Sequence, residues 1–352
     1  MISDHHIYKG IQKETSSQVR NPSDERITKE KGFVLITLLW VLAALSLLAL
    51  NLASTVRAEM SMAVASEESE KAYFYARGAL EAVIYQIVYP ELDKEGQKKL
   101  FSYADGMSHY WMNSPEMYCH VAVLDEAGKL DLNYSSEPTL ERLLRNLGVD
   151  PRLSALLAKA IMKWRGQESS PGAATVKPRQ FRSVEELLLV EGMTREILYG
   201  DPRRNQNGNA GLGRGLAEYV TVYSGGPQIN MNYAEPEVLA ALPVMDMDIA
   251  NSIVQAREKG DIKSMSDLSQ RIAALIPGET VPLLSSSISG TYSIVATAFL
   301  KNSKVHRSVK TVVKLDDTHK LQHEKLIWYD EYWPAERVLK WNQLPNVNVG
   351  VN

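Results

Sequence analysis

Residues 32–56 read GFVLITLLWVLAALSLLALNLASTV and contain no charged side chain. A helix that crosses a bilayer needs about 20 predominantly apolar residues, so this stretch is long enough to span a membrane. A helix that is apolar on all sides is typical of a segment surrounded by lipid. We therefore predict a transmembrane helix over residues 33–56.

The segment before this stretch, residues 1–31, is polar and carries six basic and five acidic side chains. Lys29 and Lys31 border the apolar run, and basic residues there favour the cytoplasmic side of a membrane. A secretory signal has a shorter apolar core followed by a small-residue cleavage motif, which is missing here. We expect a single membrane pass with the N-terminus in the cytoplasm and the C-terminal domain on the other side, which is the periplasm if the membrane is a bacterial inner membrane.

The helix is predicted to continue beyond the membrane. Residues 57–89 contain no proline, and apolar residues such as Ala76, Leu80 and Val83 recur at steps of three and four. Pro90 is a natural end for this helix. The pattern predicts one long helix whose second half has an apolar face to bury.

Strands are expected after the helix and near the other end of the chain. Alternating, β-rich residues predict strands at 117–124, 291–300 and 305–315, of which the last two form a hairpin. Residues 129–133 are expected to pair back on the first of these strands. The fold class is therefore α+β, with a long N-terminal helix packed on an antiparallel sheet.

Two segments with the same order of motifs lie between these strands. Leu130–Tyr134 (LDLNY) recurs as Ile229–Tyr233 (INMNY), and each is followed by Glu-Pro and a pair of short amphipathic helices. Both segments resemble helix-hairpin-helix units. They predict a large, all-helical insertion over residues 134–285.

The predicted segments divide the chain into a leader, a membrane helix, a helix continuation with the first strands, the insertion, a hairpin and a tail. Their bounds are 1–32, 33–56, 57–133, 134–285, 286–317 and 318–352. The tail holds Trp328, Trp333 and Trp341. It is either a partly ordered extension or an aromatic arm that docks on a partner.

The helix-hairpin-helix resemblance raises an alternative function, a membrane-anchored protein for DNA binding or uptake. DNA-binding hairpins hold phosphate on the backbone N–H groups of glycines. The hairpin at 147–152 has one glycine, whereas that at 242–248 has none and contains Asp246 and Asp248. Residues 130–200 carry ten basic and nine acidic side chains, and residues 228–276 carry four and seven. A DNA-binding module should be clearly basic, so we expect no nucleic-acid partner.

Composition and short motifs exclude several further classes of protein function. The 352 residues carry a net charge of -3, which excludes a chain-wide basic nucleic-acid binder. The single cysteine, Cys119, excludes an internal disulfide framework. Cys119 and His120 are neighbours in an alternating strand, so their side chains should point to opposite faces. Since no nucleophile, phosphate-loop or zinc-protease motif occurs, no enzyme activity is expected.

One loop is a candidate for a cofactor. Asp201, Asn205, Asn207 and Asn209 place alternating side-chain oxygens beside glycines. Such oxygens are ligands that calcium prefers, but this set contains only one carboxylate. A solvated loop without metal is the alternative, and no other cofactor is expected.

The membrane helix and its flank resemble the pilin and pseudopilin families, on residues Lys31-Gly-Phe-Val-Leu-Ile36. The resemblance implies that a prepilin peptidase cuts after Gly32 and N-methylates Phe33. The fifth mature residue is commonly glutamate in these families, whereas here it is Thr37. A missing glutamate at this position is characteristic of component K of type II secretion systems.

Later stretches are also similar to component K. They are KAYFYARGALEAV at 71–83, KLDLN at 129–133, FRSVEEL at 181–187, EYVTVY at 218–223 and QINMN at 228–232. The resemblance implies a minor pseudopilin of the type II protein secretion system. Such a protein caps the tip of the periplasmic pseudopilus and helps start its assembly, for export of folded proteins across the outer membrane.

The same resemblance implies the partners. They are the minor pseudopilins I and J, the major pseudopilin, the prepilin peptidase, the inner-membrane secretion platform and the lipid bilayer. A minor pilin of a type IV pilus is the alternative within this class.

Leader cleavage can be measured directly. We expect co-expression with a prepilin peptidase to remove residues 1–32, because the implied cut follows Gly32. Intact-mass spectrometry would detect both this loss and a methyl group on Phe33. Gly32→Leu should retain the leader. An intact leader in the unchanged chain, with Gly32 in place, would contradict the pseudopilin resemblance.

Overall fold

The computed structural model describes residues 22–89, 108–166, 179–200, 214–272, 276–301, 303, 305–316 and 322–332. The chain divides into two compact units, Met1–Ser66 and Glu67–Asn352. Helix α1 (Pro22–Val88) begins in the first unit and ends in the second.

Helix α1 confirms the predicted helix and its end. It stops at Val88, and the N–H of Tyr89 still donates to the carbonyl of Tyr85 at 2.9 Å. It begins at Pro22, earlier than expected from the apolar run alone. Proline suits the first turn of a helix, and residues 23–31 contain neither glycine nor proline that would interrupt it.

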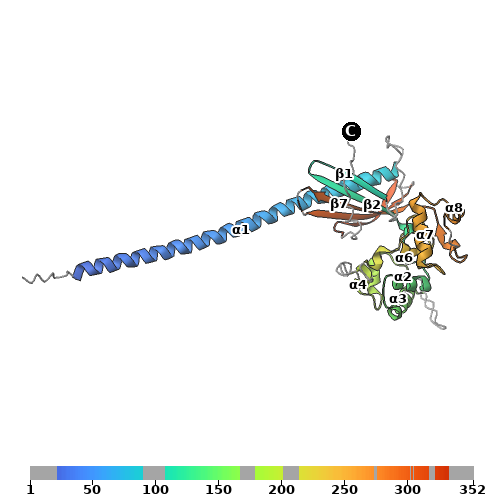
Figure 1. Ribbon diagram of the computed structural model, residues 1–352, viewed down its shortest axis with the longest axis horizontal. Helices are drawn as coiled ribbons and strands as arrows, with labels where there is room; N and C mark the ends of the chain where they lie inside the picture. The colour runs from blue at the N-terminus through green and yellow to red at the C-terminus, as the bar shows by residue number, and fades with distance from the viewer. Residues whose placement is uncertain are drawn as a thin grey trace, which may run out of the picture. The chain divides into compact units, whose positions relative to one another are not determined.

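In the second unit, five described strands form an antiparallel sheet in the order β1-β2-β7-β8-β9. They are β1 (Ser108–Asn113), β2 (Met117–Asp125), β7 (Thr291–Leu300), β8 (His306–Leu315) and β9 (His323–Tyr329). The predicted strands at 117–124, 291–300 and 305–315 are confirmed as β2, β7 and β8, with β7 and β8 forming the expected hairpin. Strands β1 and β9 were not predicted. The C-terminal part of α1 lies along this sheet (Figure 1).

The expected pairing of residues 129–133 with the first strand is wrong. Strand β2 pairs with β1 on one edge and with β7 on the other, so neither edge is left for this segment. A short 3-10 helix, η2 (Glu126–Gly128), redirects the chain. Strand β3 (Leu130–Asp131) then pairs in parallel with β4 (Val220–Thr221).

One hydrophobic core joins α1 to the sheet. The helix contributes mainly small side chains, and the strands contribute alternate residues of one face. The buried members are Ala72, Ala76, Ala79, Leu80, Val83, Ile84, Cys119, Val121, Val123, Tyr292, Ile294, Ala296, Ala298, Val309 and Val313. Alanines on both sides let the helix backbone approach the sheet closely. The apolar helix face predicted from Ala76, Leu80 and Val83 is therefore the buried one.

The described part of the tail packs on its own chain. Trp328, in β9, contacts the core between α1 and the sheet, and the Arg77 guanidinium lies 5.6 Å from its ring centroid. Asp330 accepts hydrogen bonds from the Trp328 indole at 2.7 Å and from the Tyr73 hydroxyl at 2.6 Å. Trp333 and Trp341 lie outside the described residues. In residues 322–332, β9 extends the chain's own sheet, a pairing that was not predicted for the tail.

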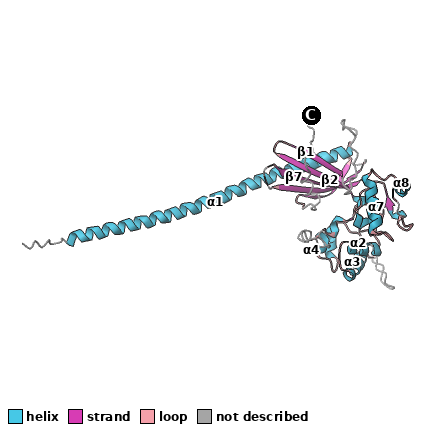
Figure 2. Ribbon diagram, viewed as in Figure 1, coloured by secondary structure: helices cyan, strands magenta, loops and turns pink. Residues whose placement is uncertain are grey.

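The insertion consists of two similar halves built from short helices (Figure 2). The first repeat contains β3, α2 (Glu137–Asn146), α3 (Pro151–Trp164), η3 (Val184–Leu189), α4 (Arg195–Tyr199), η4 (Leu216–Glu218) and β4. The second repeat contains β5 (Ile229–Asn230), α6 (Pro236–Leu239), α7 (Met247–Glu258), α8 (Met265–Arg271), η5 (Val281–Leu283) and β6 (Leu284–Ser285). In each repeat, a two-residue parallel pairing, which the sequence did not predict, joins the first strand to the last.

The buried cysteine gives a test of the helix-to-sheet core. The Cys119 side chain is fully buried, and burial raises the pKa of its thiol to about 12. We expect the folded chain to resist a thiol reagent at about pH 8, since the thiolate is the reactive form. Unfolding in guanidinium should make Cys119 react fully, as followed by absorbance. A chain with an added exposed cysteine, Lys159→Cys, is the positive control. Fast labelling of Cys119 in the folded chain would contradict this core.

Candidate functional site

The implied cleavage site lies on helix α1, in the first unit. Gly32 and Phe33 are helical residues, and the Phe33 side chain is 70% exposed. The Thr37 hydroxyl donates to the carbonyl of Val34 at 2.9 Å. Threonine is uncharged, and the Thr37 hydroxyl is hydrogen-bonded within its own helix.

Other polar residues of the apolar run are accommodated in the same way. The hydroxyls of Ser46, Ser54 and Thr55 donate to carbonyls three or four residues earlier, at 2.8, 2.7 and 3.0 Å. In lipid, a polar group must find its partner inside the protein. These side chains therefore do not conflict with a membrane environment.

The first part of α1 satisfies the requirements for a membrane span. Among the described residues, one helix is long and apolar enough, by length and composition, with a best-window mean hydropathy of 2.7 and none of that window buried. Large side chains from Phe33 to Leu52 are exposed on all sides of the helix. The predicted span at 33–56 thus coincides with a surface that needs an apolar environment.

Beyond residue 66, α1 has a second, outward face. Phe74 and Tyr85 are 64% and 53% exposed, and Gly78 lies between them on the same side of the helix. Within the described part of the chain, a Cβ built on Gly78 would meet no atom within 4 Å. This face, Phe74-Gly78-Tyr85, leaves room for another helix to approach.

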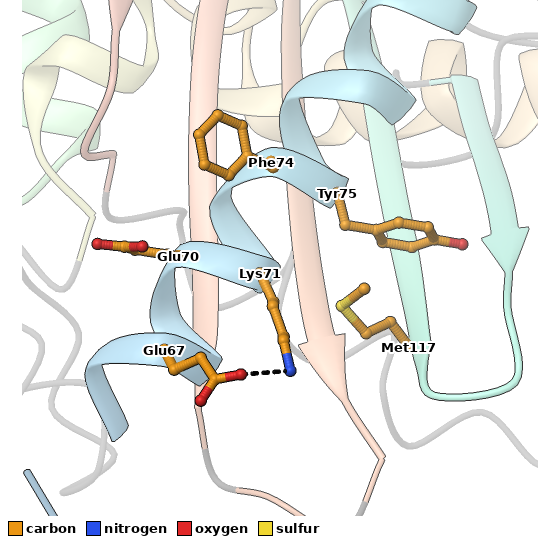
Figure 3. Close-up of a pocket in the computed structure, with 6 residues that line it drawn as sticks. All are labelled: Glu67, Glu70, Lys71, Phe74, Tyr75 and Met117. Carbon is orange, nitrogen blue, oxygen red and sulfur yellow. Dashed lines mark ion pairs between the residues drawn. The ribbon is translucent and has the colours of Figure 1, made fainter. Parts of the chain in front are cut away.

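A cavity of about 570 Å³ lies at the start of this part of α1 (Figure 3). Its lining residues are Glu67, Glu70, Lys71, Phe74, Tyr75 and Met117. Lys71 forms an ion pair with Glu67 at 2.8 Å, one helical turn apart. The hollow combines two aromatic rings and a methionine with three charged side chains.

Each repeat of the insertion is fastened by one asparagine. In the first repeat, the Asn133 amide donates to the carbonyl of Phe181 at 3.0 Å and accepts from its N–H at 2.8 Å. In the second, the Asn232 amide makes the same two bonds with Ile262, at 2.9 and 2.8 Å. A side-chain amide that bonds both groups of a distant residue replaces a strand partner.

Each repeat also buries an arginine near the end of its second helix. Arg165 donates to the carbonyls of Asn133 and Ser135, both at 2.6 Å. Arg257 donates to the carbonyls of Met231 and Ala234, at 3.1 and 2.7 Å. Neither arginine was predicted from the sequence as a functional residue. A basic residue at the end of the second helix in each repeat was the signal that could have found them.

In both hairpins an aspartate caps the helix that follows. Asp150 accepts from the N–H groups of Arg152 and Leu153 at 2.9 and 3.2 Å, and so caps α3. Asp246 caps α7 in the same way, accepting from the N–H of Ile249 at 2.8 Å. The helix N-terminus that would hold DNA phosphate already holds a carboxylate in each repeat. This geometry opposes the DNA-binding alternative, as the charge count does.

Glu126 joins the sheet to the first repeat. Its carboxylate accepts from Lys129 at 2.6 Å, from the Ser293 hydroxyl at 2.5 Å and from the Thr221 hydroxyl. Although burial acts to raise the pKa of Glu126, the ammonium groups of Lys129 and Lys310 and the hydrogen bonds from Lys129 and Ser293 bring it below its usual value. Burial lowers the pKa of Lys129, and Glu126 opposes that change.

Asp125, the preceding residue, joins the sheet to the second repeat. Its carboxylate accepts from the N–H of Ser289 at 3.0 Å, from the Ser289 hydroxyl and from the Asn230 amide at 3.4 Å. It also accepts from the N–H of Ala127 at 2.9 Å. Burial raises the pKa of Asp125. Two consecutive carboxylates thus each hold one repeat on the end of β2.

The remaining predicted site residues do not come together in the described structure. Cys119 lies in the core with α1, whereas the His120 ring lies 4.6 Å from Trp111, centroid to centroid. The calcium candidates Asp201, Asn205, Asn207 and Asn209 lie outside the described residues. Within the part of the chain that is described, no group of three or more His, Cys, Asp or Glu residues could hold a metal ion.

The second repeat matches a known family. Residues 229–289 match the model of "Type II secretion system (T2SS), protein K". The resemblance to protein K is thereby confirmed. The matched segment begins at β5 and ends at Ser289, so the protein K family is recognised on the repeat that Asp125 fastens to the sheet.

The comparisons with curated proteins and with solved structures add little to this family match. No curated protein matches the chain. Among solved structures, a chain of "The Crystal Structure of the GspK-GspI-GspJ complex from enterotoxigenic Escherichia coli Type 2 Secretion System" is similar, with 12% identity and a TM-score of 0.42. That similarity covers 75% of this chain and 97% of the other.

The junction at Glu126 can be tested by removing its charge. Glu126→Gln leaves the buried Lys129 ammonium without a counter-charge, so we expect a loss of about 3–5 kcal/mol in the free energy of unfolding near neutral pH. Urea unfolding of the detergent-solubilised chain measures this loss. The surface pair Glu141–Arg145, 3.2 Å apart, provides the control variant Glu141→Gln, with at most about 1 kcal/mol.

The same variant has a predicted pH dependence. The pKa of the Glu126 carboxyl is lower in the folded chain than in the unfolded chain. Such a carboxylate stabilises the fold at pH values above its unfolded pKa, and the stabilisation is lost as the pH falls through its folded pKa. The difference between the unchanged chain and Glu126→Gln should therefore shrink on acidification below the ordinary glutamate pKa of 4.5. A difference that grows on acidification would contradict the charged pair.

Proposed function

We propose that this chain is a minor pseudopilin, anchored in the inner membrane with its N-terminus in the cytoplasm and its second unit in the periplasm. The supporting observation is the two-part character of α1. From Phe33 to Leu52 its large apolar side chains are exposed, whereas from Ala72 to Ile84 its small side chains are buried on the sheet. Such a helix serves as a membrane anchor at one end and as part of a folded domain at the other.

Processing completes the proposed anchor. A prepilin peptidase removes residues 1–32 and methylates Phe33, whose side chain is exposed on α1. The new N-terminus then begins directly with the apolar run. The role is mechanical rather than enzymatic, and calcium held by the 201–209 loop is the only cofactor proposed.

We place the chain at the tip of the pseudopilus, where it helps start assembly. Thr37 stands where related subunits carry a charged partner for the amine of a neighbour, and its hydroxyl is already bonded to Val34. A terminal subunit needs no such partner on one side. The insertion adds a second hydrophobic core beyond the one under the sheet, a bulk that suits an end better than a packed shaft.

The partner-facing surface of the second unit is the Phe74-Gly78-Tyr85 face of α1. Helices that pack closely need a small residue where their backbones meet, and Gly78 provides it between two exposed rings. The proposed partners at this face are minor pseudopilins I and J and the major pseudopilin. The secretion platform and the prepilin peptidase contact the membrane part.

A cysteine at Gly78 tests this assignment in a secreting strain. We expect Gly78→Cys, labelled with a thiol-reactive reagent that carries a photo-crosslinking group, to form a crosslink with a pseudopilin of the same system on illumination, because the site is open and faces outward. Cys119 can remain, since its thiol is buried. The crosslinked partner is identified by mass spectrometry, and secretion of the strain's exported proteins is followed in parallel.

The matched control places the cysteine on the insertion, as Lys159→Cys on helix α3. It should not crosslink to the same partner. Failure of the unchanged chain to restore secretion in a strain that lacks its own copy would contradict the proposed function. If secretion is restored but Gly78→Cys gives no crosslink, the assigned face is wrong.

A further inference from the structure

The hairpin of the second repeat holds a valine in a conformation that valine rarely adopts. Val244 has a φ of 57° and lies two residues before Asp246, the N-cap of α7. In the first repeat, the residue two positions before the N-cap Asp150 is Gly148, with a φ of 84°. The same turn therefore carries the expected glycine in one repeat and a β-branched residue in the other.

This exchange is unfavourable for the fold. Left-handed backbone is accessible to glycine without steric cost, whereas a β-branched residue there is strained. The Val244 side chain is 61% exposed, so little packing offsets the strain. Strained residues that the fold does not need are found mainly at functional sites.

The surroundings of Val244 are apolar and acidic. Met247, three residues further, is 40% exposed. Asp246 and Asp248, beside these two side chains in sequence, are exposed. Glu279 is also exposed, and it precedes Thr280, whose hydroxyl donates to the carbonyl of Pro243 in the hairpin. The described segments 236–249 and 276–283 contain no lysine or arginine. The hairpin is thus an apolar knob whose exposed charged neighbours along the chain are acidic, while the half-buried Arg142 of α2 is bonded to hairpin carbonyls. An acidic surface of this kind is unsuited to nucleic acid or to an anionic membrane surface.

The knob is held rigidly from two sides. Arg142, on α2, donates to the carbonyls of Met245 and Ala240, at 2.5 and 3.2 Å. The Thr280 hydroxyl donates to the carbonyl of Pro243, which ties the 278–283 turn to the hairpin. A pre-ordered contact loses little entropy on binding. The first hairpin, with Gly148 at the corresponding position, has no such knob.

We propose that the hairpin around Val244 and Met247 is a docking site for a protein whose surface has an apolar pocket bordered by lysine or arginine. Val244 enters the pocket, and Asp248 and Glu279 face the basic border. The inference rests on the proposed function, because this partner acts with the chain during secretion. It assigns to the insertion a contact separate from the Phe74-Gly78-Tyr85 face of α1.

Val244→Gly separates docking from folding. Glycine relieves the strain and removes the knob, so the melting temperature in detergent should be at least as high as that of the unchanged chain. Secretion in a strain that lacks its own copy should fall at least tenfold. The control is Leu156→Ala, which removes an exposed apolar side chain (66% exposed) from helix α3 without placing a glycine in the helix. A strain that carries this control should secrete normally.

A photo-crosslinker in place of Met247 tests the chemistry of the partner. We expect a crosslink to another protein that is lost with Val244→Gly and with the charge reversal Asp248→Lys/Glu279→Lys. Normal secretion by Val244→Gly, while the unchanged chain restores secretion, would overturn the docking site. A product of twice the mass of this chain, or a crosslink unaffected by the charge reversal, would also overturn it. If the unchanged chain does not restore secretion, the proposed function fails first.

Discussion

Two consecutive buried carboxylates at the end of β2 connect the sheet to everything inserted into it. Glu126 accepts from Thr221 of the first repeat and from Ser293 of β7. Asp125 accepts from Asn230 and Ser289 of the second repeat. Burying charge is costly unless hydrogen bonds and an opposite charge compensate, and Lys129 provides that charge. These bonds give the insertion a defined attachment to the sheet.

Within the insertion, the similarity of the two repeats is clearer in their hydrogen bonds than in their amino-acid sequences. Asn133 and Asn232 each bond both backbone groups of a residue about 30 to 50 positions away, and Arg165 and Arg257 each bind the carbonyls of the turn after the first strand. The two copies differ at their hairpins, where Gly148 corresponds to Val244. A scaffold that is kept in both copies and altered at one exposed turn is consistent with a specific contact at that turn.

Helix α1 lies in two environments, the proposed lipid bilayer along its apolar run and a folded domain in the second unit. Its hydroxyls are bonded inside the helix in the apolar run, and its alanines approach the sheet in the second unit. The face that remains, with Phe74, Gly78 and Tyr85, is neither in the core nor in the predicted span. Assembly with other helices is the use that this exposed face supports best.

The sequence by itself determined the elements that depend on local periodicity and on length. The uncharged run at 32–56, the helix end before Pro90, the strands β2, β7 and β8, and the repeated LDLNY and INMNY motifs all follow from patterns along the chain. The calcium loop and the leader stay predictions, since residues 201–213 and 1–21 are not described. Tertiary structure decided the pairings between distant residues. It directed 130–131 to 220–221 because β1 and β7 occupy both edges of β2, and it added β9 to the sheet. It also placed Arg165 and Arg257 on turn carbonyls and gave Val244 its left-handed backbone. Hydrogen bonds across tens of residues leave no periodic trace in a sequence, so only the folded chain shows them.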